Sequence, residues 1–443
     1  MKKQDQNNAS RRDFVINSSL MAGGLMTAPL LSKANFFSGA EDTIKVAVVG
    51  CGGRGTGAAM QALSSKQNVK IVALCDAFKD NVDNCHKELT EEINNSIGEL
   101  AKRLDVPEER KFIGFDGYKK AIALADVVIL ATPPGFRPIH FEEAINQGKH
   151  VFMEKPVATD PAGVQKVLAT AAIAKQKKLN VVVGLQRHYQ NSYRELFKRK
   201  DLIGDITSMQ AWWDNDGVWT RPRKAGQTEM EYQMRNWYYF NWLCGDHITE
   251  QHIHNLDVIN WFKGGYPVKA QGFGGRQVRT SKEHGEIFDH HFVEFEYADG
   301  SILNSQCRHM PGTMSRVDEL LIGTKGRIAC GAAHIKDHSG KIIYQYDTKK
   351  ENNPYQTEHD ELFAAIAKGE YKFADAENGA KSTMTSILGR MATYSGQMVY
   401  WDKAIHSGID IHPKVYAWDA TPPVVPNADG SYPIAIPGIT KYS

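Results

Sequence analysis

The chain has 443 residues, of which 42% are hydrophobic and 23% charged, so it is long enough for two globular domains and lacks the composition of a disordered protein. Its formal net charge of +2 is spread over charges of both signs without a basic stripe, which argues against nucleic acid as a partner and favours a small molecule. The six cysteines lack CxxC spacing and are expected to be buried thiols.

The N-terminus predicts export. Arg11 and Arg12 form a twin-arginine pair ahead of an apolar stretch from Ser19 to Leu31, a pattern typical of Tat signals. We therefore expect residues 1–40 to be a signal peptide and the mature protein to be periplasmic. The apolar stretch is too short and too rich in Gly and Ala for a membrane span. The alternative interpretation is a disordered basic tail.

Residues 43–185 predict an α/β domain with a doubly wound parallel sheet. Helical spacing of apolar residues at 56–64 separates the first two of several short β-branched runs, and strands that alternate with helices are typical of a Rossmann domain. The runs expected to form buried strands are 44–49, 69–76, 126–131, 150–153 and 181–184.

From residue 186 to residue 415 the pattern indicates an α+β domain with a large, open-faced and mainly antiparallel sheet. A strand is expected at 206–213, and Asp299-Gly300 between two apolar runs predicts a hairpin. Helices are expected at 358–367 and 380–394. The Pro-rich end, residues 416–443, is expected to be an extended tail.

A glycine-rich turn follows the first strand. Gly50, Gly52 and Gly55 have GxGxxG spacing between a strand and a helix, where glycine lets a diphosphate approach the helix N-terminus. Asp76 ends the second strand and can accept hydrogen bonds from a ribose diol, while its charge would repel a 2′-phosphate, so NAD is favoured over NADP. The whole turn is expected to contact the cofactor: Gly50, Cys51, Gly52, Gly53, Arg54 and Gly55.

The order of further motifs resembles the Gfo/Idh/MocA oxidoreductase family. Ala131-Thr132-Pro133 follows the glycine-rich turn, and Gly148 to Val151 then runs into Glu154-Lys155-Pro156. Residues 245–261 and 376–402 are also similar to that family. The resemblance implies a dinucleotide-dependent oxidoreductase, with further cofactor contacts from Thr132, Pro133, His140, Glu154, Lys155 and Gln186.

The resemblance also implies catalytic roles for Lys155, Glu250 and His254. An ammonium group beside a nicotinamide can hold the substrate hydroxyl. Glu250 and His254 fit the acid-then-histidine frame of the family, and their spacing of four predicts one helical face, on which the carboxylate orients the imidazole while His254 takes the hydroxyl proton. The family usually has Asp where Glu250 stands, so Asp246 is the alternative acid.

The segment from Asp246 to His254 is rich in groups that can bind metal. It lacks HExxH spacing, and the dinucleotide motif already accounts for the chemistry, so we expect no metal. A zinc site formed by His247, Glu250 and His254 is the alternative.

Aromatic residues between Trp212 and Trp242 stand among charged and amide groups, a mixture that suits carbohydrate. The alternative is that they form domain core or a subunit interface. The expected substrate contacts are Lys155, Arg187, Trp213, Trp219, Arg235, Trp237 and His254.

Together these features predict an NAD-dependent oxidoreductase that acts on a CH–OH group of a sugar or sugar derivative. Because Tat export carries folded proteins into a compartment without an evident NAD supply, we expect the NAD to be tightly bound and recycled internally. One alternative is a redox-neutral NAD-dependent glycosidase that uses a keto-sugar intermediate, and another is a non-catalytic NAD- or sugar-binding protein. By analogy, the open sheet favours a homodimer or homotetramer.

Overall fold

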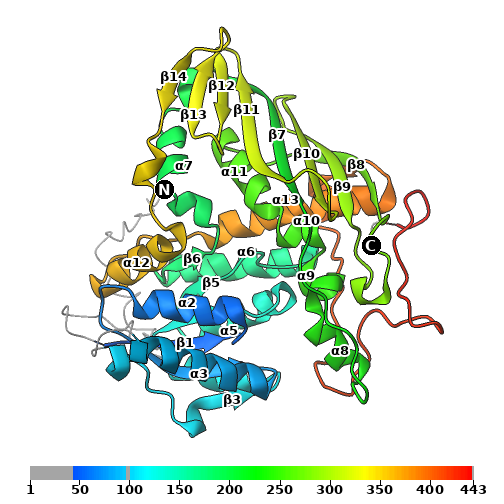
Figure 1. Ribbon diagram of the computed structural model, residues 1–443. Coiled ribbons are helices and arrows are strands. Elements are labelled where there is room, and N and C mark those ends of the chain that lie inside the picture. The colour runs from blue at the N-terminus through cyan, green and yellow to red at the C-terminus, as the bar shows by residue number, and fades with distance from the viewer. Residues whose placement is uncertain (1–42, 96–99, 442–443) are drawn as a thin grey trace, which may run out of the picture. The chain divides into compact units, whose positions relative to one another are not determined.

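The computed structural model describes residues 43–95 and 100–441 (Figure 1). The predicted signal peptide therefore lies outside the described residues. No helix within the described part of the chain combines the length and the apolar character needed to cross a bilayer.

The first domain is built on a six-stranded parallel sheet with the strand order β3-β2-β1-β4-β5-β6. This is the order of doubly wound dinucleotide-binding folds, so the predicted fold class is confirmed. The strands are β1 (Ile44–Val49), β2 (Val69–Asp76), β3 (Lys111–Ile113), β4 (Val127–Leu130), β5 (His150–Met153) and β6 (Val181–Val183). The helices of this domain are α2 (Gly53–Leu63), α3 (Lys79–Asn95), α4 (Gly117–Ala123), α5 (Arg137–Asn146) and α6 (Pro161–Gln176).

Both faces of this sheet are covered, which explains why its strands are continuous hydrophobic runs. Side chains alternate along a strand, so Val46 and Val48 of β1 join a hydrophobic cluster that includes residues of α2 and α3. Ala47 and Val49 point the other way and join a second cluster, to which α5 and α6 contribute.

The second domain contains a nine-stranded sheet in which β7 (Ile206–Asn215) and β10 (Ile302–His309) pair in parallel and all other described neighbours are antiparallel. The predicted hairpin at Asp299-Gly300 joins β9 (His290–Glu296) to β10. The remaining strands are β8 (Lys269–Gly275), β11 (Arg316–Gly323), β12 (Gly326–Ala329), β13 (His334–Asp337), β14 (Ile342–Gln345) and β15 (Val399–Tyr400).

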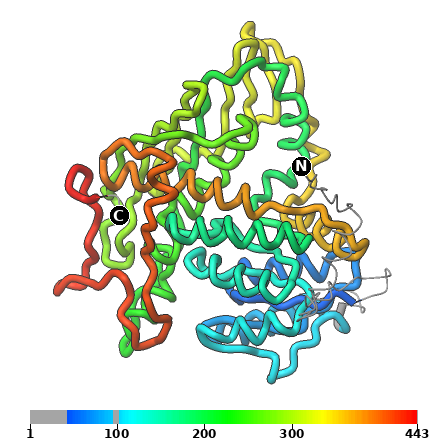
Figure 2. The backbone as a smooth tube through the Cα atoms, turned by 180° about the vertical axis from the view of Figure 1, so that it is seen from behind, coloured from blue at the N-terminus to red at the C-terminus, as the bar shows by residue number. Residues whose placement is uncertain are grey.

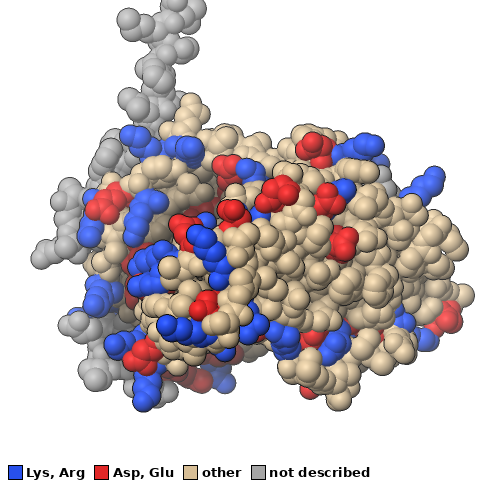
Figure 3. All heavy atoms as spheres, turned by 90° about the horizontal axis from the view of Figure 1, so that it is seen from above, with Lys and Arg blue, Asp and Glu red and all other residues tan. Residues whose placement is uncertain are grey.

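Helices cover one face of the second sheet (Figure 1). Burial alternates residue by residue along β9 and β10, so the opposite face is open, as predicted. On the surface seen in Figure 3, cationic and anionic side chains are interspersed. The helices of this part are α7 (Asn191–Phe197), α8 (Glu229–Arg235), α9 (Asn241–Cys244), α10 (His247–Glu250), α11 (Ile253–Lys263), α12 (Pro354–Ala367), α13 (Ala376–Ser395) and α14 (Trp401–Ile405).

The C-terminal part of the chain packs on both sheets. Leu362 and Phe363 of α12 belong to the hydrophobic cluster of α2 and β1, whereas α13 lies along β8 and α6. Residues 416–441 form no helix or strand but are anchored beside α8 (Figure 2). There the Thr228 hydroxyl donates to the carbonyl of Trp418, 2.6 Å away.

Candidate active site

The glycine-rich turn has the geometry of a phosphate-binding turn. Gly50 has a φ of +99°, and a Cβ atom there would lie 2.4 Å from the main chain of Ala131. A Cβ atom on Gly55 would lie 1.8 Å from the carbonyl oxygen of Gly50. In contrast, a Cβ atom on Gly52 or Gly53 would meet no atom within 4 Å. No side chain caps the N-terminus of α2, so its free N–H groups are available to an anion in that open space.

Asp76 ends β2 beside this turn. Its Oδ2 atom accepts a hydrogen bond from the main-chain N–H of Cys51 at 2.8 Å. Its Oδ1 atom accepts from the N–H of Phe78 at 2.9 Å and from the side-chain amide of Asn81 at 3.1 Å. Burial raises the pKa of Asp76, and these hydrogen bonds oppose the rise. The carboxylate is therefore held where a ribose diol is expected.

A cavity of about 770 Å³ opens over the glycine-rich turn, a size within the usual range for small-molecule sites. Of the predicted cofactor residues, those that line it are Gly50, Gly52, Gly53, Arg54, Asp76, Thr132, Pro133 and His140. Cys51, Gly55, Glu154, Lys155 and Gln186 are not among the lining residues. The polar and glycine-rich floor of this cavity fits the diphosphate and ribose of a dinucleotide.

An aromatic wall of this cavity was missed by the sequence analysis. Phe78, Phe115 and Phe136 line the cavity, and the ring of Trp418 packs 4.6 Å from Phe115 and 5.0 Å from Phe78. Phe78 and Phe115 each stand two residues after the end of a strand, β2 and β3. Because ligands bind at the carboxyl ends of such strands, that position is a signal that could have identified them.

The aromatic residues predicted to bind substrate lie in two places, because Trp213 packs beside His254 and the others line the dinucleotide-type cavity. Trp219, Arg235 and Trp237 line the dinucleotide-type cavity. There Arg235 donates two hydrogen bonds of 2.8 Å to Asp80, and its guanidinium lies 3.6 Å from the ring centroid of Phe78. These three residues therefore lie on the same side of the site as Asp76.

Lys155, two residues after β5, pairs with Glu250. Its Nζ atom donates to the carbonyl oxygen of Glu250 at 2.7 Å and to Oε1 of the same residue at 3.1 Å. The two side chains are only 11% and 9% exposed. Burial raises the pKa of Glu250, while the charge of Lys155 acts in the opposite direction. The neighbouring Glu154 accepts a hydrogen bond of 2.5 Å from Nε of Arg54.

The prediction that Glu250 and His254 share one helical face is wrong. Helix α10 ends at Glu250, and α11 begins at Ile253. His252 lies at the break and is fully buried, with Nε2 2.7 Å from the hydroxyl of Ser305 on β10. The Glu250 carboxylate contacts Nζ of Lys155 at 3.1 Å, so it orients this ammonium group and not the imidazole of His254.

His254 is buried beside Trp213. The two rings stack with their centroids 5.9 Å apart, and Nδ1 of His254 has no hydrogen-bond partner. Burial, followed by the charges of Lys155 and Arg187, lowers the pKa of His254 well below its ordinary value of 6.5. The imidazole is therefore neutral at neutral pH and can accept a proton.

Several of the residues predicted to form the site have buried polar atoms without a partner in the described part of the chain. They come from the end of β6, from β7 and from α10 and α11. Buried polar groups are normally hydrogen-bonded, so the set indicates a site for a ligand with several hydroxyl groups. The atoms are Oε1 of Gln186, Nε of Arg187, Nε1 of Trp213, Oε2 of Glu250 and Nδ1 of His254.

The alternative assignments in this segment are not assembled as predicted. Asp246 faces β9, and its Oδ2 atom accepts hydrogen bonds from the hydroxyl of Tyr394 at 2.5 Å and the N–H of Phe288 at 3.0 Å. The zinc set of His247, Glu250 and His254 is not among the groups of described residues whose ligand atoms lie close enough to share a metal ion, and the Glu250 carboxylate is paired with Lys155.

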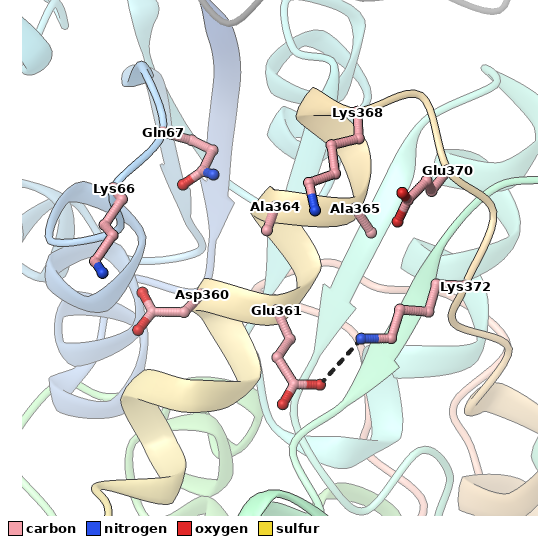
Figure 4. Close-up of a pocket in the computed structure, with 9 residues that line it drawn as sticks. All are labelled: Lys66, Gln67, Asp360, Glu361, Ala364, Ala365, Lys368, Glu370 and Lys372. Atoms are coloured by element: carbon pink, nitrogen blue, oxygen red, sulfur yellow. Dashed lines mark hydrogen bonds and ion pairs between the residues drawn. The ribbon is translucent and has the colours of Figure 1, made fainter.

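A second hollow, of about 280 Å³, lies between α12 and the α2–β2 connection (Figure 4). Charged side chains of both signs line it, and Lys372 pairs with Glu361 there at 3.5 Å. None of the residues predicted to form the functional site lines this hollow, so we assign it no part in the reaction.

The fold and the cavity over the glycine-rich turn define a protein with a dinucleotide-binding Rossmann domain. Residues 44–185 match the sequence model of the Gfo/Idh/MocA family, described as an oxidoreductase family with an NAD-binding Rossmann fold. The match confirms, for this part of the chain, the resemblance to the Gfo/Idh/MocA family that its motifs show.

Individual relatives are distant. The chain is 28% identical to an inositol 2-dehydrogenase of Gluconacetobacter diazotrophicus over 54% of its own length and 60% of the relative. It is 23% identical to a 2,7-anhydro-N-acetylneuraminate hydratase of Mediterraneibacter gnavus, over 70% of this chain and 75% of that one. The fold is similar to scyllo-inositol dehydrogenase of Lactobacillus casei with bound NAD(H) and scyllo-inositol, with a TM-score of 0.60, 21% identity and coverage of 82% of this chain and 100% of that chain.

Proposed function

We propose that this protein is an NAD-dependent oxidoreductase that oxidises a hydroxyl of a sugar or a related cyclic polyol. The observation that carries the proposal is the set of buried, unpartnered polar atoms on predicted site residues, His254 among them, in a chain whose glycine-rich turn lines a dinucleotide-type cavity. The name of the inositol 2-dehydrogenase relative supports a polyhydroxylated ring as substrate.

The residues of the cavity would hold NAD by its three parts. The N–H groups at Gly52 and Gly53 would bind the diphosphate, and Asp76 would bind the adenosine ribose. Thr132 and Pro133, after β4, would border the nicotinamide half. When bound, NAD accepts a hydride from the carbinol carbon of the substrate.

The side chains of Lys155 and His254 would act on the hydroxyl group of the substrate and remove its proton. Lys155, fixed by Glu250, would hold the substrate hydroxyl oxygen and stabilise the negative charge that develops on it. The neutral imidazole of His254 would accept the hydroxyl proton at an unpartnered nitrogen. Trp213 would pack against the C–H face of the ring, and Gln186 and Arg187 would bind its other hydroxyls.

The same cavity supports the proposal that NAD is tightly retained. Trp219, Arg235 and Trp237 of the second domain line it together with the glycine-rich turn, and Trp418 of the C-terminal segment packs on its aromatic wall. Release of NAD would require several of these contacts to open, which favours a cofactor that stays bound and is recycled between two substrates.

The test is an absorbance measurement on the purified protein without added cofactor. We expect nucleotide to co-purify, and we expect the near-ultraviolet band of reduced nicotinamide to grow when an oxidisable sugar or inositol is added and to fall when a keto-sugar is added. A band whose absorbance changes with none of the added substrates would instead support a non-catalytic binding protein. Protein free of nucleotide that gains none from added NAD would overturn the cofactor assignment.

A redox-neutral reaction through a keto-sugar is the second candidate. It is favoured by the hydratase relative, whose aligned share, 75% of its length, exceeds that of the inositol dehydrogenase. In that case the reduced band would appear only transiently and the product would have the same oxidation state as the substrate. Mass spectrometry of the products distinguishes this reaction from net oxidation.

Two further proposals concern the environment of the enzyme. We propose Tat export to the periplasm because of the Arg11-Arg12 pair. Replacement of both arginines by Lys should retain the protein in the cytoplasm. We also propose self-association through the open face of the second sheet, where Phe273 is 65% exposed and stacks on Phe292 at 5.3 Å. Light scattering should report a dimer or tetramer that Phe273→Asp weakens.

A further inference from the structure

We infer that Asp246, His247 and His291 bind a divalent transition-metal ion, with Zn²⁺ as the ion that best suits two imidazoles and a carboxylate. This site is distinct from the Lys155–Glu250 pair and goes beyond the proposed oxidoreductase function. One ligand atom from each of the three residues lies within 4.8 Å of the others. All three side chains are buried, with exposed fractions of 0% to 2%.

The distances between the ligand atoms fit a shared ion. Nδ1 of His247 lies 2.8 Å and Nε2 of His291 lies 3.3 Å from the same atom, Oδ1 of Asp246. Despite these short distances, neither nitrogen has the angles of a hydrogen bond, and both are without a partner in the described part of the chain. Ligands of one tetrahedral zinc ion, at bond lengths of about 2.1 Å, lie roughly 3.4 Å apart.

The hydrogen bonds of His291 direct a lone pair toward Asp246. Nδ1 of His291 lies 2.8 Å from the hydroxyl oxygen of Thr393. The hydroxyl oxygen also lies 3.2 Å from the helix carbonyl of Gly389 and 3.1 Å from that of Arg390; when the hydroxyl donates to these carbonyls, it accepts from Nδ1–H of His291. The free lone pair of Nε2 then faces a carboxylate oxygen, which is repulsive unless a cation lies between them. A second hydrogen bond that fixes the tautomer is typical of metal-binding histidines.

The main chain at Asp246 shows that the fold maintains this arrangement at a cost. Asp246 has φ 70° and ψ 162°, a region that side-chain-bearing residues rarely occupy because it is strained. The other oxygen of its carboxylate is fixed by Tyr394 and by the N–H of Phe288. Oδ1 is thereby held toward the two imidazoles.

Further unpartnered groups surround the three ligands. The ring of His309 lies 4.4 Å from that of His247, and neither ring nitrogen of His309 has a partner. Tyr238 stacks on His309 at 5.8 Å, and its hydroxyl is also buried without a partner. A water molecule on the fourth position of the ion would give these groups a hydrogen-bonding partner.

The position of the site suggests what the ion does. His247 is the first residue of α10 and Glu250 is its last, whereas His291 belongs to β9. An ion would therefore tie the short helix that presents Glu250 to the second sheet. The expected role is to position Glu250, and through it Lys155.

The experiment uses the full chain, purified without a histidine tag, loaded with Zn²⁺ and dialysed, with metals counted by mass spectrometry. We expect one zinc ion per chain in the wild type. In a His247→Ala/His291→Ala double variant, we expect the amount of bound zinc to fall at least roughly tenfold. His412→Ala is the matched control, because His412 joins Asp160 and Asp410 in the other metal-capable group of the described residues. It should retain the ion.

Three results would overturn the inference: wild-type protein that keeps no zinc, a double variant that keeps a full equivalent, or loss only in His412→Ala. Folding of each variant is followed by circular dichroism. If the double variant does not fold, the test is anomalous diffraction at the zinc absorption edge from crystals of the wild-type protein. A peak between Asp246 and His291 supports the site, and its absence after soaking contradicts it. These readouts are independent of turnover and of NAD content.

Discussion

The Nζ atom of Lys155 contacts both the main-chain carbonyl and the carboxylate of Glu250, a residue 95 positions later in the chain. Both side chains are about nine-tenths buried. A buried ammonium paired with one carboxylate is held in position, since removal of either partner leaves an uncompensated charge in a poorly solvated place. This pair therefore fixes an ammonium group at the carboxyl end of β5, where the substrate hydroxyl is proposed to bind.

Replacement of Lys155 by Ala should abolish most of the turnover without releasing the cofactor. We expect kcat to fall by roughly 100- to 10,000-fold, the range for loss of a residue that holds or transfers a proton. Bound nucleotide, measured after denaturing the protein, should be unchanged, because Lys155 does not line the dinucleotide-type cavity. The control is Lys166→Ala, which removes a part-exposed pair with Glu142. Wild-type turnover in Lys155→Ala would contradict the assigned role.

The acid limb of the pH profile should identify His254 as the base. Burial, Lys155 and Arg187 together lower the pKa of His254, so kcat/KM, which reports the free enzyme, should stay high as the pH falls through 6.5 and decline only at lower pH. Arg187→Gln removes one of the positive charges and should move this limb to higher pH. Arg110→Gln, at an exposed pair with Asp105, should leave it in place. An acid limb that Arg187→Gln moves to lower pH would exclude His254 as the base.

Two alanine substitutions in the glycine-rich turn should have different consequences. Gly55→Ala places a methyl group 1.8 Å from the carbonyl oxygen of Gly50, so we expect it to lower the free energy of unfolding by about 1–3 kcal/mol or more. Gly52→Ala meets no protein atom and should leave stability nearly unchanged, while its methyl group displaces the diphosphate. Urea unfolding and NAD titration of both variants test this separation. Equal loss of NAD binding and stability in the two variants would contradict it.

The sequence was most informative where the signal is local. The β-branched runs, the glycine spacing after Val49 and the turn at Asp299-Gly300 each depend on a few neighbouring residues, and all three features are present as predicted. The short strands β12, β13 and β14 were not predicted. The last of these, Ile342–Gln345, has exposed or half-exposed side chains throughout, so it lacks the hydrophobic alternation that identifies a strand.

The site was only partly predictable because tertiary packing decides which side chains meet. The motifs correctly placed Lys155 at the end of a Rossmann strand, but no local pattern shows that Glu250 will turn toward it. The spacing of four predicted one helical face for Glu250 and His254, whereas a break at His252, which contacts Ser305, separates α10 from α11. The separation of Trp213 from Trp219 follows from the path of the chain after β7, which composition cannot reveal.

His252 should make the stability of the protein depend on pH. Burial lowers its pKa to about 3, whereas the ordinary value is 6.5. As the pH falls below 6.5, the unfolded chain binds a proton at this position that the folded protein does not bind, so the free energy of unfolding decreases until the pH reaches about 3. Above 6.5 the group makes no pH-dependent contribution.

The variant His252→Gln tests this expectation. It should be less stable than the wild type at neutral pH, because the contact with Ser305 is altered. On acidification its free energy of unfolding should fall less steeply than that of the wild type, by up to about 1.4 kcal/mol per pH unit. Urea unfolding at several pH values measures both slopes, and His338→Gln, which changes an exposed histidine, should keep the slope of the wild type. Identical slopes for His252→Gln and the wild type would show that His252 is protonated in the folded protein, and the break between α10 and α11 would then need another anchor.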